Sequence, residues 1–221
     1  MGTGLADVTA HEVGHTLGLR HNFAASQSIP YDQLYNGSYT RLHGFDSVMD
    51  YIRPIVAPTD ELQATTEIFP GGHTIGRYDR LAIEYGYTVI TDEDPTVQHP
   101  DCIEIADRMA KEGIIFNTDE DAGYGVDPTA YRYDVSDNPV KAALDTMTAA
   151  QTMRDNAHRV YGWESKDGWA DMTQVLQQSI GMQHRAALIA AGYLGGRVIK
   201  HEFVNAHVQG VGEEKYAPDT R

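Results

Sequence analysis

The most specific pattern in the chain is HEVGHTLGLRH, residues 11–21. On a helix, His11 and His15 project from the same face, because four residues are slightly more than one turn. Two imidazoles placed in this way can share one tetrahedral ion, at Zn–N distances of about 2.0–2.1 Å. Gly18 tolerates the positive φ of a helix terminus, so the chain can turn back and bring His21 to the same ion.

Glu12 lies beside the first histidine rather than on the face that would hold the metal. From that position a carboxylate can take a proton from a water molecule that the metal has activated. Three neutral nitrogens leave one position of a tetrahedral zinc ion open, which is typical of catalytic sites and not of closed structural ones. The sequence therefore predicts Zn²⁺ bound by His11, His15 and His21, with Glu12 as a general base.

The composition argues against several other classes of protein. The single cysteine, Cys102, rules out a disulfide framework and a thiolate zinc cluster, and we expect it to be inert and partly buried. A formal net charge of −15 over 221 residues repels phosphate backbones, so nucleic acid is not an expected partner. No stretch approaches the roughly 18 apolar residues of a membrane helix, and Met1–Gly4 does not have the features of a signal peptide.

Apolar periodicity predicts a chain that is mostly helical with few strands. Irregular structure is expected over Ser26–Arg41 and Ile52–Gly72, which are rich in turn-forming residues, and a strand over Ile114–Phe116. The acidic stretch Asp119–Asp137 is expected to be loop, with at most a short strand. The predicted helices are 5–19, 78–86, 103–111, 139–162 and 171–191.

A second motif, SVMDY, follows at residues 47–51. HEVGHTLGLRH followed by SVMDY resembles the metzincin clan of zinc metallopeptidases, whose signature combines this zinc motif with a Met-turn. The resemblance implies that Met49 forms an apolar floor under the zinc ligands without binding the metal. It also implies a role for Tyr51, whose phenol would stabilise the developing oxyanion; a phenol without a role is the alternative.

Further segments extend the resemblance over nearly the whole chain. IGRYDRLAIEYGY (75–87), FNTDEDAGYGVDP (116–128) and GYLGGRVIKHEF (192–203) are similar to segments of the large bacterial zinc-dependent metalloproteases labelled Met-zincin. This similarity implies a bacterial, exported endopeptidase, secreted or periplasmic, that acts on polypeptides. It also implies that this stretch is part of a longer polypeptide.

Two features depart from the metzincin pattern. Metzincins place a substrate-binding sheet before the zinc helix, whereas only ten residues precede His11. We therefore expect a preceding segment or a partner chain to complete the cleft. Asn22, which follows the third histidine, fits none of the better-known metzincin subfamilies.

The expected fold class is α+β and mostly helical, with a metzincin-like zinc helix and Met-turn and with the upstream sheet largely absent. Residues 1–90 would carry the zinc helix, the Met-turn and the next helix. Residues 91–221 would form a mainly helical region packed on them, or the two parts would be one continuous domain.

Several alternatives remain open at the level of sequence. The chain could be a catalytically silent zinc-binding module, or an exopeptidase with the same metal chemistry. The acidic residues of 92–94 and 119–137 could bind calcium, although a solvated acidic face is favoured because their spacing does not match an EF-hand. The remaining histidines that we considered are expected to lie at the surface or to form no second site: His43, His73, His184, His201 and His207.

Overall fold

The computed structural model describes residues 2–51, 55–56, 67–68, 75–90, 99–123, 127–160 and 168–199. These residues are mostly helical, as predicted. The helices are α1 (Gly2–Thr16), α2 (Gly37–His43), α3 (Arg77–Tyr87), α4 (Pro100–Lys111), α5 (Asp119–Gly123), α6 (Pro139–Val160) and α7 (Gly168–Gly192). Three short 3₁₀ helices are η1 (Ala25–Ser28), η2 (Tyr31–Gln33) and η3 (Pro128–Ala130). Within these ranges the only sheet is an antiparallel pair, β1 (Ile55–Val56) with β2 (Glu67–Ile68).

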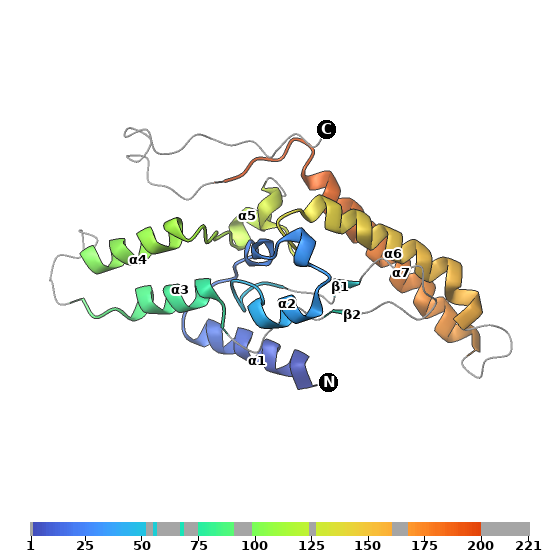
Figure 1. Ribbon diagram of the computed structural model, residues 1–221, viewed down its shortest axis with the longest axis horizontal. Helices are drawn as coiled ribbons and strands as arrows, with labels where there is room; N and C mark the ends of the chain where they lie inside the picture. Colours follow the sequence, from blue (N-terminus) through green and yellow to red (C-terminus); the bar gives the residue numbers. More distant parts are fainter. Residues whose placement is uncertain are drawn as a thin grey trace.

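The two longest helices, α6 and α7, lie side by side at one end of the molecule, and α3 and α4 extend from the other end (Figure 1). Ala143 of α6 and Ala186 of α7 are buried against each other together with Ile189. Small alanine side chains let the two helices approach closely, which suits ridges-into-grooves packing. The α6–α7 pair is therefore held together by this cluster at one end of the molecule.

Two further apolar clusters flank the central segments. Between α3 and α4, the buried cluster consists of Tyr78, Leu81, Ile105 and Ile114. The other joins the segment after α1 to α6 and consists of Ile29, Leu34, Phe45 and Ala142. Together these clusters fix the position of the loops that lie between α1, α3 and α5.

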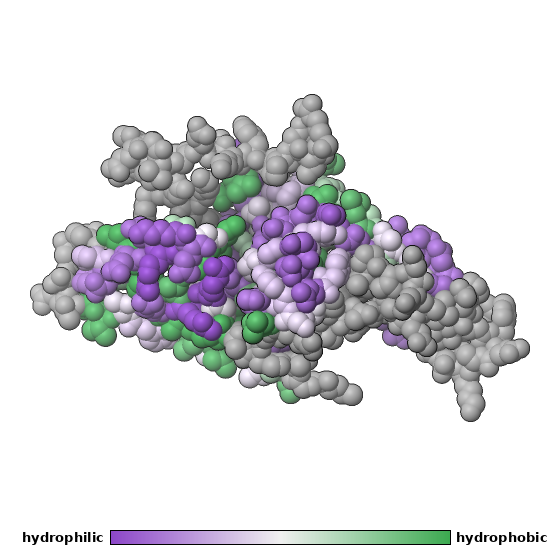
Figure 2. Space-filling view, viewed as in Figure 1, coloured by the Kyte–Doolittle hydropathy of each residue, from purple (hydrophilic) through white to green (hydrophobic). Residues whose placement is uncertain are grey.

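Helix α1 leaves much of its apolar surface uncovered. Leu5 is 71% exposed and Val13 49% exposed, and both line an apolar groove with Leu17 and Ile75. Figure 2 shows mainly hydrophilic residues over α4, with hydrophobic residues visible toward the edge where α1 lies. No described helix is both long enough and apolar enough to span a membrane.

The expectation of irregular structure over Ser26–Arg41 was wrong, because this segment contains η1, η2 and most of α2. The side chain of Asn36 accepts hydrogen bonds from the backbone N–H groups of Ser38 and Tyr39. An asparagine N-cap of this kind satisfies donors that would otherwise be unpaired at the start of a helix. The turn-forming composition therefore marked the start of α2 and not a long loop.

The predicted strand over Ile114–Phe116 was also wrong. Gly113 has φ +67° and ends α4, with the N–H of Ile114 donating to the carbonyl of Met109 at 3.0 Å. Ile114 then enters the apolar cluster of α3 and α4. The Ile115 carbonyl accepts a hydrogen bond from the Asn22 side chain, a partner from outside any sheet.

The acidic stretch 119–137 is neither all loop nor all solvated, contrary to expectation. It contains α5 and η3, and Asp121, Asp127 and Asp134 are buried to 5% exposure or less. Asp121 accepts from the Thr118 backbone N–H, and Asp127 from that of Thr129. Asp121 and Asp127 therefore cap short helices, while Asp134 accepts from the Ser26 hydroxyl.

Other predictions have mixed outcomes. His43 is exposed as expected, and His184, for which only the lack of a second site was expected, is exposed as well. Cys102 in α4 is more deeply buried than expected, at 4% exposure. The division of the chain near residue 90 stays a prediction. The following predicted features lie outside the described residues: the helix end at Gly162, the acidic residues 92–94, and the side chains of His73, His201 and His207.

Candidate metal centre

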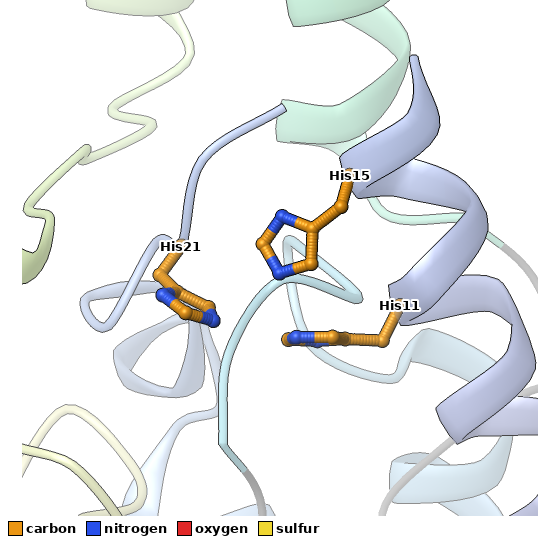
Figure 3. A group of neighbouring side chains, drawn as sticks. All are labelled: His11, His15 and His21. Carbon is orange, nitrogen blue, oxygen red and sulfur yellow. The ribbon is translucent and has the colours of Figure 1, made fainter. Parts of the chain in front are cut away.

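Three histidines converge at the C-terminal end of α1 (Figure 3). His11 and His15 project from one face of the helix, and His21 comes from the loop that follows. The ring centroids of His11 and His15 are 4.8 Å apart, and His21 lies 5.3 Å and 4.8 Å from them. One ligand nitrogen from each ring lies within 4.8 Å of the others. In the described part of the chain, this is the only such group of three metal-ligating residues.

Gly18 makes this convergence possible. Its φ of +87° belongs to the left-handed region, which glycine adopts without steric cost. The N–H of Leu19 donates to the carbonyl of Gly14, and the N–H of Gly18 to that of His15, both at 3.0 Å. These two bonds define a Schellman motif, so the chain reverses immediately after α1 and carries His21 back.

Hydrogen bonds also fix the ring orientations of the two helical histidines. Nδ1 of His11 lies 2.8 Å from the carbonyl oxygen of Val48, and Nδ1 of His15 lies 2.9 Å from that of Leu19. A carbonyl oxygen can only accept, so in both rings Nδ1 must carry the proton. Nε2 of each ring is therefore left with a free lone pair. The acceptor for His15 is placed by the same turn that Gly18 creates.

Nδ1 of His21 is held by a carboxylate, Oδ2 of Asp119, at 2.8 Å. The Nε2 atom of this ring is buried and has no hydrogen-bond partner. A buried nitrogen without a partner is costly unless something binds it. Burial is also the main reason why the pKa of His11 is lowered, with His15 and His21 adding to the effect. The neutral form of the His11 ring is thus favoured.

Met49 lies directly under the histidine helix and is fully buried. A Cβ atom at Gly14 would be 2.4 Å from Sδ of Met49, so the methionine packs on the bare backbone of α1 between the two histidines. The carbonyl of Met49 accepts from the N–H of Asn22 at 3.2 Å. Met49 therefore links the helix to the loop that carries His21.

A buried carboxylate holds the turn that contains Met49. Asp79 of α3 is 0% exposed and accepts from the Ser47 hydroxyl at 2.5 Å and from the N–H groups of Val48 and Gly76, each at 2.8 Å. The carbonyl of the same Val48 accepts the hydrogen bond from Nδ1 of His11. Asp79 therefore positions the residue whose carbonyl orients the His11 ring.

The two other predicted site residues border the histidines. The half-buried ring of Tyr51 has its centroid 4.7 Å from His21 and 5.4 Å from His11. Tyr133, which has φ +70°, stacks on Tyr51 at 6.1 Å. Glu12 is exposed on α1 beside His11, and its charge acts to raise the pKa of that histidine.

The family comparison agrees with this geometry. The sequence profile of the Met-zincin family matches residues 1–216. The chain belongs to the Met-zincin family. No curated protein and no solved structure matches the chain.

Membership in the Met-zincin family implies a zinc metallopeptidase, and the three histidines suit zinc as the metal. Zinc accepts imidazole nitrogens in tetrahedral geometry, and each metal-ligating histidine usually donates its other N–H to a carbonyl or carboxylate. All three Nδ1 atoms of this Met-zincin have such an acceptor. The buried, unpartnered Nε2 of His21 is the atom that a metal would satisfy.

Several residues of the site were not found from the sequence. Asn22 had been noted only as a departure, but it is fully buried and its side chain ties the His21 loop to Ile115 and to the N–H of Asn117. Gly14 lies within the motif, and a glycine between the two histidines could have indicated that another residue packs closely on α1 there. Asp119 is 98 residues from His21, and no local pattern connects the two.

A pair of buried carboxylates lies next to the site. Asp50 is 5% and Asp134 2% exposed, and both accept from Ser26, the former from its backbone N–H and the latter from its hydroxyl. Burial raises the pKa of Asp50 from 3.8 to about 7. Burial and then the neighbouring charge of Asp50 raise the pKa of Asp134 well above its ordinary value.

Proposed function

We propose that this Met-zincin is a zinc-dependent metalloendopeptidase that hydrolyses internal peptide bonds of polypeptides. His11, His15 and His21 would bind Zn²⁺ through Nε2. The observation that carries the proposal is that all three Nδ1 atoms are already engaged by acceptors. This pattern leaves the three Nε2 lone pairs free, and one ligand nitrogen from each ring lies within 4.8 Å of the others, as one shared ion requires.

Zinc bound there would polarise the scissile carbonyl and lower the pKa of a coordinated water toward about 7. The carboxylate of Glu12 would accept the proton of the attacking water and later deliver it to the leaving amine nitrogen. Its exposure on α1 leaves it free to exchange protons with solvent between turnovers. The hydroxyl of Tyr51, whose ring borders both His11 and His21, would donate to the developing oxyanion.

We further propose that residues 47–51 form the Met-turn of this chain. The support is the packing of Met49 on Gly14 together with the Val48 carbonyl that orients His11. Met49 would act as a floor through packing alone, because its thioether lies against the helix backbone. Its contribution would therefore be to the rigidity of the ligands and not to the charge on the metal.

Metal content and proteolysis measured on the same protein test the proposal. We expect one zinc per chain, and hydrolysis of casein that a chelator abolishes and added zinc restores. Glu12→Ala should retain the zinc and lose the hydrolysis, because the base and not the ligand set is removed. Unchanged turnover in that variant would refute the mechanism.

The same assay separates the alternatives. Cleavage of a peptide with both ends blocked supports an endopeptidase, whereas activity only on a free-ended peptide would replace it with an exopeptidase. Stoichiometric zinc without any hydrolysis would identify a silent zinc-binding module. Absence of zinc from the wild-type protein would overturn the whole assignment.

A further inference from the structure

We propose that Asp119 is a positioning residue that orients His21 toward the metal. The inference rests on the proposed function and deepens it, because it adds to the three ligands a carboxylate that no motif marked. Oδ2 of Asp119 lies 2.8 Å from Nδ1 of His21. A carboxylate on the far nitrogen of a metal-binding imidazole fixes the tautomer and raises the basicity of the nitrogen that binds the metal.

His21 needs such support more than the other two histidines. His11 and His15 are fixed by the helix backbone of α1 and by main-chain carbonyls. His21 lies instead in the loop after Gly18, where no helical hydrogen bonds constrain its backbone. The ring is therefore oriented by what its side chain contacts, and Asp119 supplies its polar contact.

The contact between Asp119 and His21 is one of two that join this loop to the start of α5. Next to Asp119, Glu120 accepts from one guanidinium nitrogen of Arg20 through both carboxylate oxygens, at 2.7 and 2.6 Å. Two consecutive acidic residues thus bind two consecutive residues of the loop. The Arg20–Glu120 pair is more than half exposed on both sides, whereas the side chain of His21 is only 15% exposed.

Arg132 binds the oxygen of Asp119 that His21 does not contact. Its guanidinium donates to Oδ1 of Asp119 at 3.1 Å, which leaves Oδ2 for His21. A carboxylate oxygen accepts hydrogen bonds, and Oδ2 of Asp119 lies 2.8 Å from Nδ1 of His21. Nδ1 of that ring therefore carries the proton, and Nε2, which has no hydrogen-bond partner, is left for the metal.

The experiment compares zinc affinity in two variants that each remove one negative charge. Asp119→Asn changes the residue that contacts His21, and Glu120→Gln changes its neighbour, whose carboxylate binds Arg20. Competition with a chromogenic chelator gives the zinc dissociation constant. We expect Asp119→Asn to weaken binding about 10–100-fold, the usual effect of losing such a partner, and Glu120→Gln to change it by less than about threefold, since an exposed ion pair contributes little.

A spectroscopic measurement on the metal-free wild type tests the same inference without a variant. Long-range ¹H–¹⁵N correlation spectra distinguish the two tautomers of a histidine ring. Near pH 8 we expect His21 with its proton on Nδ1, and we expect the Asp119→Asn spectrum to lose that single form. Detection of wild-type His21 with its proton on Nε2 would overturn the inference even if the variant failed to fold.

Failure of the inference and failure of the proposed function have different signatures. If the wild type binds zinc and Asp119→Asn binds it equally well, only the role of Asp119 is refuted. If both variants lose zinc affinity to the same degree, the loss of one negative charge near the site explains the effect, and the positioning role is again refuted. If the wild type binds no zinc, the proposed function fails first.

Discussion

The packing of Met49 on Gly14 predicts that Gly14→Ala destabilises the protein, although alanine is the better helix former. A Cβ at residue 14 would lie 2.4 Å from Sδ of Met49, 3.5 Å from its Cε and 3.6 Å from Cδ1 of Leu19. A Cβ at that distance would force the thioether of Met49 to shift. Met49 is fully buried, so its thioether cannot move aside into solvent.

Two opposing terms set the size of the effect. Overpacking of a core costs about 1–3 kcal/mol, while replacing glycine by alanine within a helix gains about 0.5–1 kcal/mol. The net expectation is a loss of up to about 2.5 kcal/mol, or a Tm lower by up to about 10 °C for a chain of this length. Displacement of Met49 should also disturb Val48, whose carbonyl orients His11, and thereby weaken zinc binding.

Thermal unfolding of the metal-free protein, followed by circular dichroism, measures the stability term. Gly86→Ala is the matched control, because Gly86 lies in α3 with no heavy atom within 4 Å of its added Cβ. That variant should be unchanged or more stable by up to about 1 kcal/mol. The reasoning is refuted if Gly14→Ala is as stable as Gly86→Ala. Met49→Ala should be less destabilising in the Gly14→Ala background than in the wild type, because the clash is then absent.

Three further predictions concern other parts of the site. Because the pKa of Asp50 rises from 3.8 to about 7 on folding, the unfolded chain loses this proton first as pH increases. Stability should fall by up to about 4 kcal/mol between pH 4 and pH 7, and urea unfolding of Asp50→Asn should lack much of that slope. Gly18→Ala should lower the free energy of unfolding by about 1–2 kcal/mol and weaken zinc binding in the chelator assay. Tyr51→Phe should lower kcat about 100-fold with little change in KM, and an unchanged kcat would remove Tyr51 from the mechanism.

Local spacing accounts for the features that were predicted correctly. The four-residue step from His11 to His15 requires only helix geometry, and the positive φ of Gly18 requires only the absence of a Cβ. The start of α6 also follows from local signals, since the Asn138 side chain accepts from the N–H of Lys141 and Pro139 opens the helix. The general base, the substrate class, the bacterial source and the exported location stay predictions.

Local sequence pattern gave wrong predictions for segments whose structure depends on burial against distant parts of the chain. Ile114–Phe116 has the β-branched character of a strand, yet Asn22 supplies a hydrogen-bond partner from another part of the chain. The spacing of Asp134 suggests a solvated acidic residue, yet its side chain is buried and accepts from the hydroxyl of Ser26, 108 residues away. A residue's environment depends on distant segments, and composition does not encode which segments these are.

The sequence by itself determined which atoms could bind a metal, because ligand type and helical spacing are local properties of residues 11–21. Only the tertiary structure decided how those atoms are held. The partners of His11 and His21 are Val48 and Asp119, which are distant in the sequence. Hydrogen bonds have short range and strict direction, so these contacts exist only once α1, the turn at Met49 and α5 have been packed together.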